Sequence, residues 1–172
     1  ISYRNNTTIV HNPERPLIEN LDTLPFPAYH LVENNIHKYH FTTMAGRNTR
    51  YMILEGARGC NHQCSFCTQW HHWGGQWRTK STKRIADEIQ YLHDTYGGVF
   101  LWFTDDHMRL GQRGKHLYEE LKQKPCTKDI MLFFQARTDD VARHPELIEK
   151  LRKVGTYYIL CGVETNSQQM LR

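Results

Sequence analysis

Residues Gly59-Cys60-Asn61-His62-Gln63-Cys64-Ser65-Phe66-Cys67 place three of the chain's five cysteines on one short segment, in the spacing C-x3-C-x2-C. The segment follows the apolar run of residues 51–54, so we expect it to be a loop that leaves a buried strand. Three thiolates on one tight loop suit a soft metal centre, because the loop can wrap around the metal and point each sulfur inward. An iron–sulfur cube usually takes four cysteines, so three would leave one iron open to a substrate or cosubstrate.

The cysteine triplet is also compatible with two arrangements that contain no iron. A zinc ion could take His62, His71 or His72 as a fourth ligand, although structural zinc sites usually show two separated pairs of ligands. The three thiols could also be unligated neighbours. A disulfide framework does not suit a chain of 172 residues with five cysteines.

The charge of the chain is mild and evenly spread. Its 22 basic and 18 acidic residues give a net charge of +4, which does not argue for a nucleic-acid partner. No apolar run has the length of a membrane span, and no signal peptide is visible. Three closely spaced thiols kept as metal ligands fit a reducing cytoplasm, which is the location that we expect.

The first 45 residues differ from the rest of the chain. Residues 1–10 predict a small hairpin with its turn at Asn5-Asn6. The prolines between residues 12 and 27 break regular structure and predict a linker that lies on a surface. We therefore divide the chain into a hairpin and proline-rich linker at residues 1–45 and a core at residues 46–172.

From residue 51 onward, predicted strands alternate with predicted helices. Apolar runs predict strands at residues 51–55, 99–103, 130–134 and 157–160. The helices expected between them span residues 82–96 (begun by Ser81 or Thr82 and ended by Gly97), the region of Leu117 and Leu121 up to Pro125, residues 145–154, and a segment starting at Asn166. This alternation predicts an α/β fold with a parallel sheet and right-handed crossovers.

Polar residues follow each predicted strand. In barrel-like α/β folds the site gathers at the carboxyl ends of the strands, which is also where the cysteines lie. This rule selects Glu55, Arg58, Thr104, Asp105, Asp106, Gln135, Arg137 and Glu164. A buried structural ion network is the alternative interpretation of Asp105, Arg137 and Glu164.

Cys60, Cys64 and Cys67, in the phrase that runs from Arg58-Gly59 to Phe66-Cys67, resemble the cluster-binding loop of the radical S-adenosylmethionine (SAM) enzymes. The resemblance implies a [4Fe-4S] cluster held by these cysteines, with its open iron chelated by the amino and carboxylate groups of SAM. The reduced cluster would pass an electron to the sulfonium, so that the bond to the 5′ carbon breaks. Methionine and a 5′-deoxyadenosyl radical would form, and the radical would abstract hydrogen from a substrate. The implied fold is a partial (β/α)6 TIM-like barrel, truncated here after about the fourth βα unit.

The same resemblance implies SAM contacts for three polar residues. Asp105 lies in the segment that typically contacts the methionyl amino group, although the sequence here is Thr104-Asp105-Asp106 and not Gly-Gly-Glu. Glu164 resembles the position that binds the ribose hydroxyls, and a carboxylate can accept two hydrogen bonds from a diol. Arg137 could pair with the SAM carboxylate through its planar fork. We assign no catalytic residue.

Two further phrases are similar to a cobalamin-associated branch of this family. Leu21 to Pro27 resembles the junction between a cobalamin-binding domain and the catalytic core, and Cys67-Thr68-Gln69-Trp70 resembles the anaerobic magnesium-protoporphyrin monomethyl ester cyclases. The branch implies cobalamin bound by an absent upstream domain, and a cyclase or methyltransferase reaction at an unreactive carbon. It also implies an electron donor such as flavodoxin or ferredoxin, and a small-molecule substrate such as a tetrapyrrole or another flat, apolar molecule. The Trp- and His-rich residues 70–78 could face such a substrate, but we favour packing over the cluster.

Two rival functions are compatible with the sequence. One is a radical SAM methylthiotransferase that acts on RNA or protein. The other is a non-enzymatic, zinc-binding interaction module built on the cysteine triplet.

Overall fold

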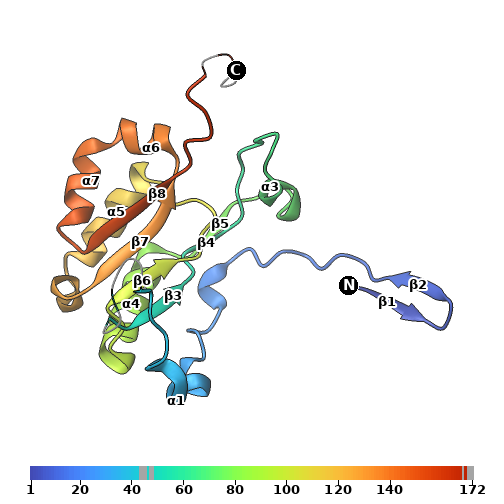
Figure 1. Ribbon diagram of the computed structural model, residues 1–172, viewed down its shortest axis with the longest axis horizontal. Helices are drawn as coiled ribbons and strands as arrows, with labels where there is room; N and C mark the ends of the chain where they lie inside the picture. The colour runs from blue at the N-terminus through green and yellow to red at the C-terminus, as the bar shows by residue number, and fades with distance from the viewer. Residues whose placement is uncertain (43–45, 47–48, 168, 170–172) are drawn as a thin grey trace.

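The computed structural model describes residues 1–42, 46, 49–167 and 169, and a parallel sheet forms its centre. Figure 1 shows this sheet with helices packed along it. The strands stand in the order β3 (Tyr51–Leu54), β6 (Phe100–Phe103), β7 (Met131–Ala136) and β8 (Thr156–Cys161), and each is parallel to its neighbour. The predicted α/β class and its four predicted strands are therefore confirmed.

Amphipathic helices cover one face of the sheet. Alternate strand residues, such as Leu54, Phe103 and Phe134, are buried in one core with Ile89 of α4 and Leu117 of α5. None of the helices in the described ranges is long and apolar enough to cross a membrane. The helical segments that follow β3 are α3 (Gln69–His72), α4 (Thr82–Tyr96), α5 (Gly111–Leu121), η3 (Pro125–Lys128), α6 (Thr138–Arg143) and α7 (Pro145–Arg152).

The helix ends follow the sequence signals closely. The Ser81 hydroxyl accepts a hydrogen bond from the Arg84 backbone N–H and caps α4, whose end is fixed by Gly97 in the left-handed conformation at φ 64°. Pro145 occupies the start of α7, where its missing N–H costs no hydrogen bond. At the predicted fourth helix, Asn166 and Ser167 are not helical, and residues 168 and 170–172 lie outside the described residues.

The opposite face of the sheet carries aromatic rings. Trp102 lies in the middle of this face, with its ring centroid 4.9 Å from that of Phe133 and 5.5 Å from that of Phe41. Tyr51 and Tyr158 extend the aromatic contacts to β3 and β8. Both faces of the sheet are thus apolar, as expected for parallel strands.

The N-terminal hairpin is confirmed and extends away from the sheet (Figure 1). Strand β1 (Ser2–Asn5) pairs with antiparallel β2 (Thr8–His11), and Asn6 makes the turn at φ 55°. Asparagine tolerates this conformation better than most residues. The short helical segments that the structure bounds before β3 are η1 (Leu21–Thr23), η2 (Tyr29–Val32) and α1 (Glu33–Ile36).

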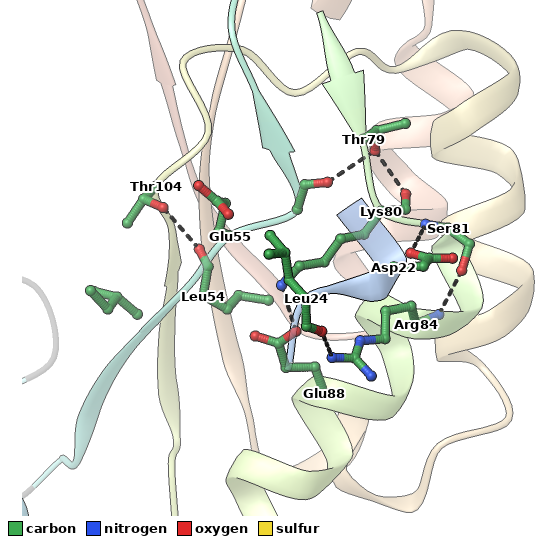
Figure 2. Close-up of polar contacts among 12 residues, drawn as sticks. Asp22, Leu24, Leu54, Glu55, Thr79, Lys80, Ser81, Arg84, Glu88 and Thr104 are labelled. Atoms are coloured by element: carbon green, nitrogen blue, oxygen red, sulfur yellow. Dashed lines mark hydrogen bonds and ion pairs between the residues drawn. The ribbon is translucent and has the colours of Figure 1, made fainter. Parts of the chain in front are cut away.

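Residues 21–29, which we call the strap, are docked against α4. The Leu21 side chain is fully buried. The Asp22 carboxylate accepts a hydrogen bond from the Ser81 backbone N–H at 2.8 Å, and the Leu24 carbonyl accepts one from Arg84 at 2.6 Å (Figure 2). The strap therefore contacts the first turn of α4 through both a side chain and its own backbone.

The end of the strap also protects the open edge of β3. The Tyr29 hydroxyl donates to the Ile53 carbonyl at 2.8 Å and accepts from the Ile53 N–H at 2.9 Å. A single side chain thereby takes the place of a neighbouring strand at an edge that would otherwise be unpaired. The division of the chain at residue 45 remains a prediction, but the strap packs as part of the core.

Candidate functional site

The base of the cysteine loop is held rigidly. The two-residue strands β4 (Ala57–Arg58) and β5 (Arg78–Thr79) pair in antiparallel fashion on either side of residues 59–77. Gly59, directly before the first cysteine, has φ 90°, and a Cβ atom there would lie 2.1 Å from the Gln76 carbonyl oxygen. Only glycine fits this close approach of two backbones, so the point at which the loop begins is fixed.

Within the loop, Cys60, Cys64 and Cys67 are free thiols of intermediate exposure. The Cys64 carbonyl accepts hydrogen bonds from the Cys67 N–H at 3.1 Å and from the Trp70 indole N–H at 3.2 Å. Trp70 therefore packs on the loop, whereas His71 and His72 are exposed. Residues 70–78 contribute at least one ring to the packing around the cysteines.

The three cysteine side chains do not form a complete set of metal ligands. Among the described residues, no group of three or more His, Cys, Asp or Glu side chains is arranged to hold a metal ion. The chemistry of the donors nevertheless fits an iron–sulfur cluster, because three soft sulfur ligands stand on one loop and none is consumed by a disulfide.

Asp105 lies where the strand-end rule puts it, but its carboxylate faces the backbone. Its Oδ1 atom accepts a hydrogen bond from the Gly56 N–H, just beyond β3, at 2.6 Å. The side chain is 1% exposed, and burial raises its pKa to about 6. The backbone hydrogen bonds to the carboxylate stabilise its ionised form and oppose this rise. The buried Oδ2 atom has no hydrogen-bond partner among the described residues. A contact of Asp105 with SAM therefore remains a prediction.

Asp106 reaches the cysteine loop from the end of β6. Its half-buried carboxylate accepts hydrogen bonds from the Gly59 backbone and the Trp73 side chain. Burial raises its pKa, and these two hydrogen bonds oppose the rise. The pair Asp105-Asp106 thus joins the end of β6 to both ends of the turn between β3 and the cysteines.

Arg137, at the end of β7, lies on the cysteine side of the sheet. Its Nε donates to Asp139 Oδ1 at 2.9 Å, and this hydrogen bond is the main reason why its pKa is raised. Cys60 and Cys64 are near enough to contribute to the same rise. Arg137 is therefore the one predicted SAM contact that the described structure brings within electrostatic reach of the predicted cluster ligands.

Glu164 is not brought to the other predicted site residues. It is exposed on the segment that follows β8, and this segment runs away from the sheet (Figure 1). Its predicted contact with a ribose is therefore not tested by these residues.

A contact between the buried His107 and the partly exposed His62 was not anticipated from the sequence. The rings of His107 and His62 meet edge to face with centroids 5.4 Å apart, so the β6–α5 segment supports the cysteine loop. His107 is 5% exposed, and burial lowers its pKa to about 4. The only sequence signal was its position directly after Asp105-Asp106.

Arg113 is a second unanticipated residue. From α5 it donates to the Thr79 hydroxyl at 2.9 Å and to the Gly56 carbonyl at 3.1 Å. It thereby braces β5 and the end of β3, which flank the cysteine loop. A helix residue with a long polar side chain gives no pattern from which such a role could be predicted.

Comparison with known proteins agrees with this geometry. Residues 54–172 match the family model of the radical SAM superfamily. The chain is 26% identical over 171 residues, 99% of its length, to an "uncharacterized methyltransferase" of Pyrococcus horikoshii, and covers 35% of that protein. It is 25% identical over 174 residues, 100% of its length, to the anaerobic magnesium-protoporphyrin IX monomethyl ester cyclase of Synechocystis, and covers 33% of it. A hopanoid C-3 methylase of Methylococcus capsulatus is 29% identical over 136 residues, with 78% of this chain and 25% of that protein covered.

The chain thus spans between a quarter and about a third of the length of these relatives. Its family match, however, includes the cysteine loop and the whole parallel sheet apart from the first residues of β3. The chain belongs to the radical SAM superfamily.

Proposed function

We propose that this chain is the N-terminal part of the catalytic core of a cobalamin-associated radical SAM enzyme. Cys60, Cys64 and Cys67 hold a [4Fe-4S] cluster, and the core is a partial (β/α)6 barrel of which about four βα units are present here. The observation that carries the proposal is the cysteine loop itself, rooted at the carboxyl edge of a parallel sheet by Gly59 and the β4–β5 pair. A cluster bound there would supply the electron for the reductive cleavage of SAM.

In this proposal the protein holds and orients the two cofactors. Arg137, which lies within electrostatic reach of Cys60 and Cys64, binds the carboxylate of SAM through its planar guanidinium group. Asp105 and Glu164 keep their predicted roles at the amino group and the ribose of SAM. Trp70, which contacts the loop backbone, packs against the cluster and excludes water from it.

The reaction that we propose is methyl transfer or ring closure at an unreactive carbon of a small, flat, apolar molecule, with an electron donor such as flavodoxin or ferredoxin. The names of the relatives, methyltransferases and a tetrapyrrole cyclase, support this choice. They favour it over a methylthiotransferase, which remains the alternative enzyme. Cobalamin would be bound by an upstream domain, and the docked strap offers a firm attachment for one.

Anaerobic reconstitution of the full-length protein tests the cluster. Single Cys→Ala variants at positions 60, 64 and 67 should lose iron and labile sulfide, and should not form 5′-deoxyadenosine from SAM under reducing conditions. Cys126→Ala and Cys161→Ala are the matched controls, because both thiols lie elsewhere in the fold and burial raises the pKa of each. Both controls should retain iron and cleavage.

Two outcomes would contradict the proposal. Unchanged SAM cleavage in any of the three loop variants would remove that cysteine from the ligand set. A colourless wild-type protein that binds one equivalent of zinc and no iron would establish the zinc module instead.

A further inference from the structure

A cavity of about 580 Å³ lies between the first turns of α4 and α5, apart from the cysteines. Its walls come from the end of β5, the start of α4, and the segment that leads from β6 into α5. The volume falls within the range of small-molecule sites. The proposed reaction at the cysteine loop gives this cavity no role.

Two arginines gather around one indole in the wall of this cavity. The guanidinium carbon of Arg109 lies 4.8 Å from the centroid of the Trp77 ring, and that of Arg113 lies 5.5 Å from it. Arg113 is engaged with the Thr79 hydroxyl and the Gly56 carbonyl. Arg109 is exposed, and no ion pair among the described residues includes it. An arginine that stacks on an aromatic face keeps the N–H groups at its edge free for a ligand.

The other charges that line the cavity are already satisfied within the protein. The buried ammonium group of Lys80 pairs with Glu88 at 2.8 Å. The Asp140 carboxylate accepts a hydrogen bond from the Leu110 N–H at 2.9 Å. The guanidinium groups of Arg109 and Arg113 outnumber this carboxylate, so the lining of the cavity keeps a net positive charge that is centred on Arg109.

The backbone adds a second attraction for anions. At the start of α5 the Asp140 carboxylate takes the Leu110 N–H, but within the described chain the N-cap side chain makes no hydrogen bond to the N–H groups of the first turn, which belong to residues that line the cavity. Such N–H groups and the positive end of the helix dipole favour phosphate. A planar guanidinium beside them matches the oxygens of the same group.

We propose that this cavity binds a phosphate-bearing small molecule. Arg109 is the principal contact, Trp77 holds its guanidinium plane in place, and the first turn of α5 supplies backbone hydrogen bonds. The ligand would be recognised separately from SAM, since the cavity is lined by none of the predicted cluster ligands or SAM contacts.

Calorimetric titration of the cluster-loaded, full-length protein with pyrophosphate tests this inference, with inorganic phosphate as the smaller probe. Wild-type protein should show saturable binding. Arg109→Gln should weaken the binding at least about tenfold, the loss expected for one charge-assisted contact. Arg109→Lys, which keeps the charge but loses the fork, should fall between the two.

Lys115→Gln is the matched control, because Lys115 is an exposed cation on the same helix that does not line the cavity. It should bind pyrophosphate as the wild type does. Trp fluorescence that responds to pyrophosphate in the wild type and not in Trp77→Phe would place the ligand at this indole. Absence of saturable binding, or equal weakening in Arg109→Gln and Lys115→Gln, would overturn the proposal.

Discussion

Asp105→Asn should remove a defined pH dependence from the stability of the fold. The folded pKa of Asp105 is about 6, against an ordinary value of 3.8, and one pKa unit corresponds to about 1.4 kcal/mol. Asp105 therefore favours folding most below about pH 4, where it is protonated in both states. Its contribution to the free energy of unfolding then falls by about 3 kcal/mol as the pH rises through 6.

His107 acts in the opposite direction over nearly the same pH range. Its folded pKa is about 4, against an ordinary value of 6.5, because the buried ring resists protonation. Its contribution is fully present above about pH 6.5 and falls by about 3 kcal/mol as the pH drops through 4. In the wild type, the fall in the Asp105 contribution and the rise in the His107 contribution with increasing pH should therefore largely cancel between the folded pKa values of the two groups. Asp105→Asn should leave a protein that loses stability on acidification, and His107→Gln should leave one that loses stability as the pH rises.

Urea unfolding of the metal-free chain, followed by circular dichroism from about pH 4 to about pH 7, measures these slopes. The decisive quantity is the difference in the free energy of unfolding between each variant and the wild type at each pH. The contributions of the other titrating groups cancel in that difference. A plot for Asp105→Asn that runs parallel to that of the wild type would refute the buried, titrating carboxylate. Parallel plots for His107→Gln would refute the buried neutral imidazole.

The supports of the site lead to three further predictions. Gly59→Ala should prevent the loop from starting in its present path, since the added carbon would meet a backbone carbonyl, and should lower the iron bound per chain after reconstitution. Tyr29→Phe should destabilise the fold by about 1–3 kcal/mol in urea unfolding, because it leaves the β3 edge without its hydroxyl partner. Lys80→Met should cost about 3–5 kcal/mol in the same assay by leaving the Glu88 carboxylate buried and unpaired, and Lys80→Met combined with Glu88→Leu should recover most of that loss.

The regular elements were predictable because local signals and packing agree. Ser81 caps α4 and Gly97 ends it, while the apolar positions between them are spaced to meet the sheet. Helix α6 was missed, because its six residues include no buried side chain and so carry no apolar period. The β4–β5 pair was missed for a similar reason: two residues per strand are too few to show an alternation.

The strap shows what composition leaves open. Its prolines correctly exclude long helices and strands, but they do not show how the segment packs against the core. It docks through a buried leucine, one carboxylate and one backbone carbonyl. Contacts made by the backbone leave little trace in the sequence, since almost any side chain is compatible with them.

The strand-end rule located the site but could not orient its side chains. It fixes where the Cα atom of Asp105 lies, whereas the direction of the carboxylate depends on which donors remain unpaired nearby. A buried carboxylate must be hydrogen-bonded, and the Gly56 N–H at the end of the neighbouring strand was the donor within reach. Arg137 is not fully buried, so water can satisfy the part of its guanidinium group that the protein does not bind. The group therefore remains partly exposed on the cysteine side of the sheet.

The same reasoning applies to the cysteine loop, where the contacts of the protein fix the surroundings of the three thiols. Three thiolates brought together with no cation would repel one another, so metal binding and the closing of such a site are coupled. The protein alone can fix only what surrounds the sulfurs: the turn at Gly59, the Asp106 carboxylate on the backbone of that glycine, and the Trp70 indole on the Cys64 carbonyl. Each of these contacts involves the backbone or a neighbour of the loop. In the proposed function, this fixed base positions the loop that carries the three cysteines.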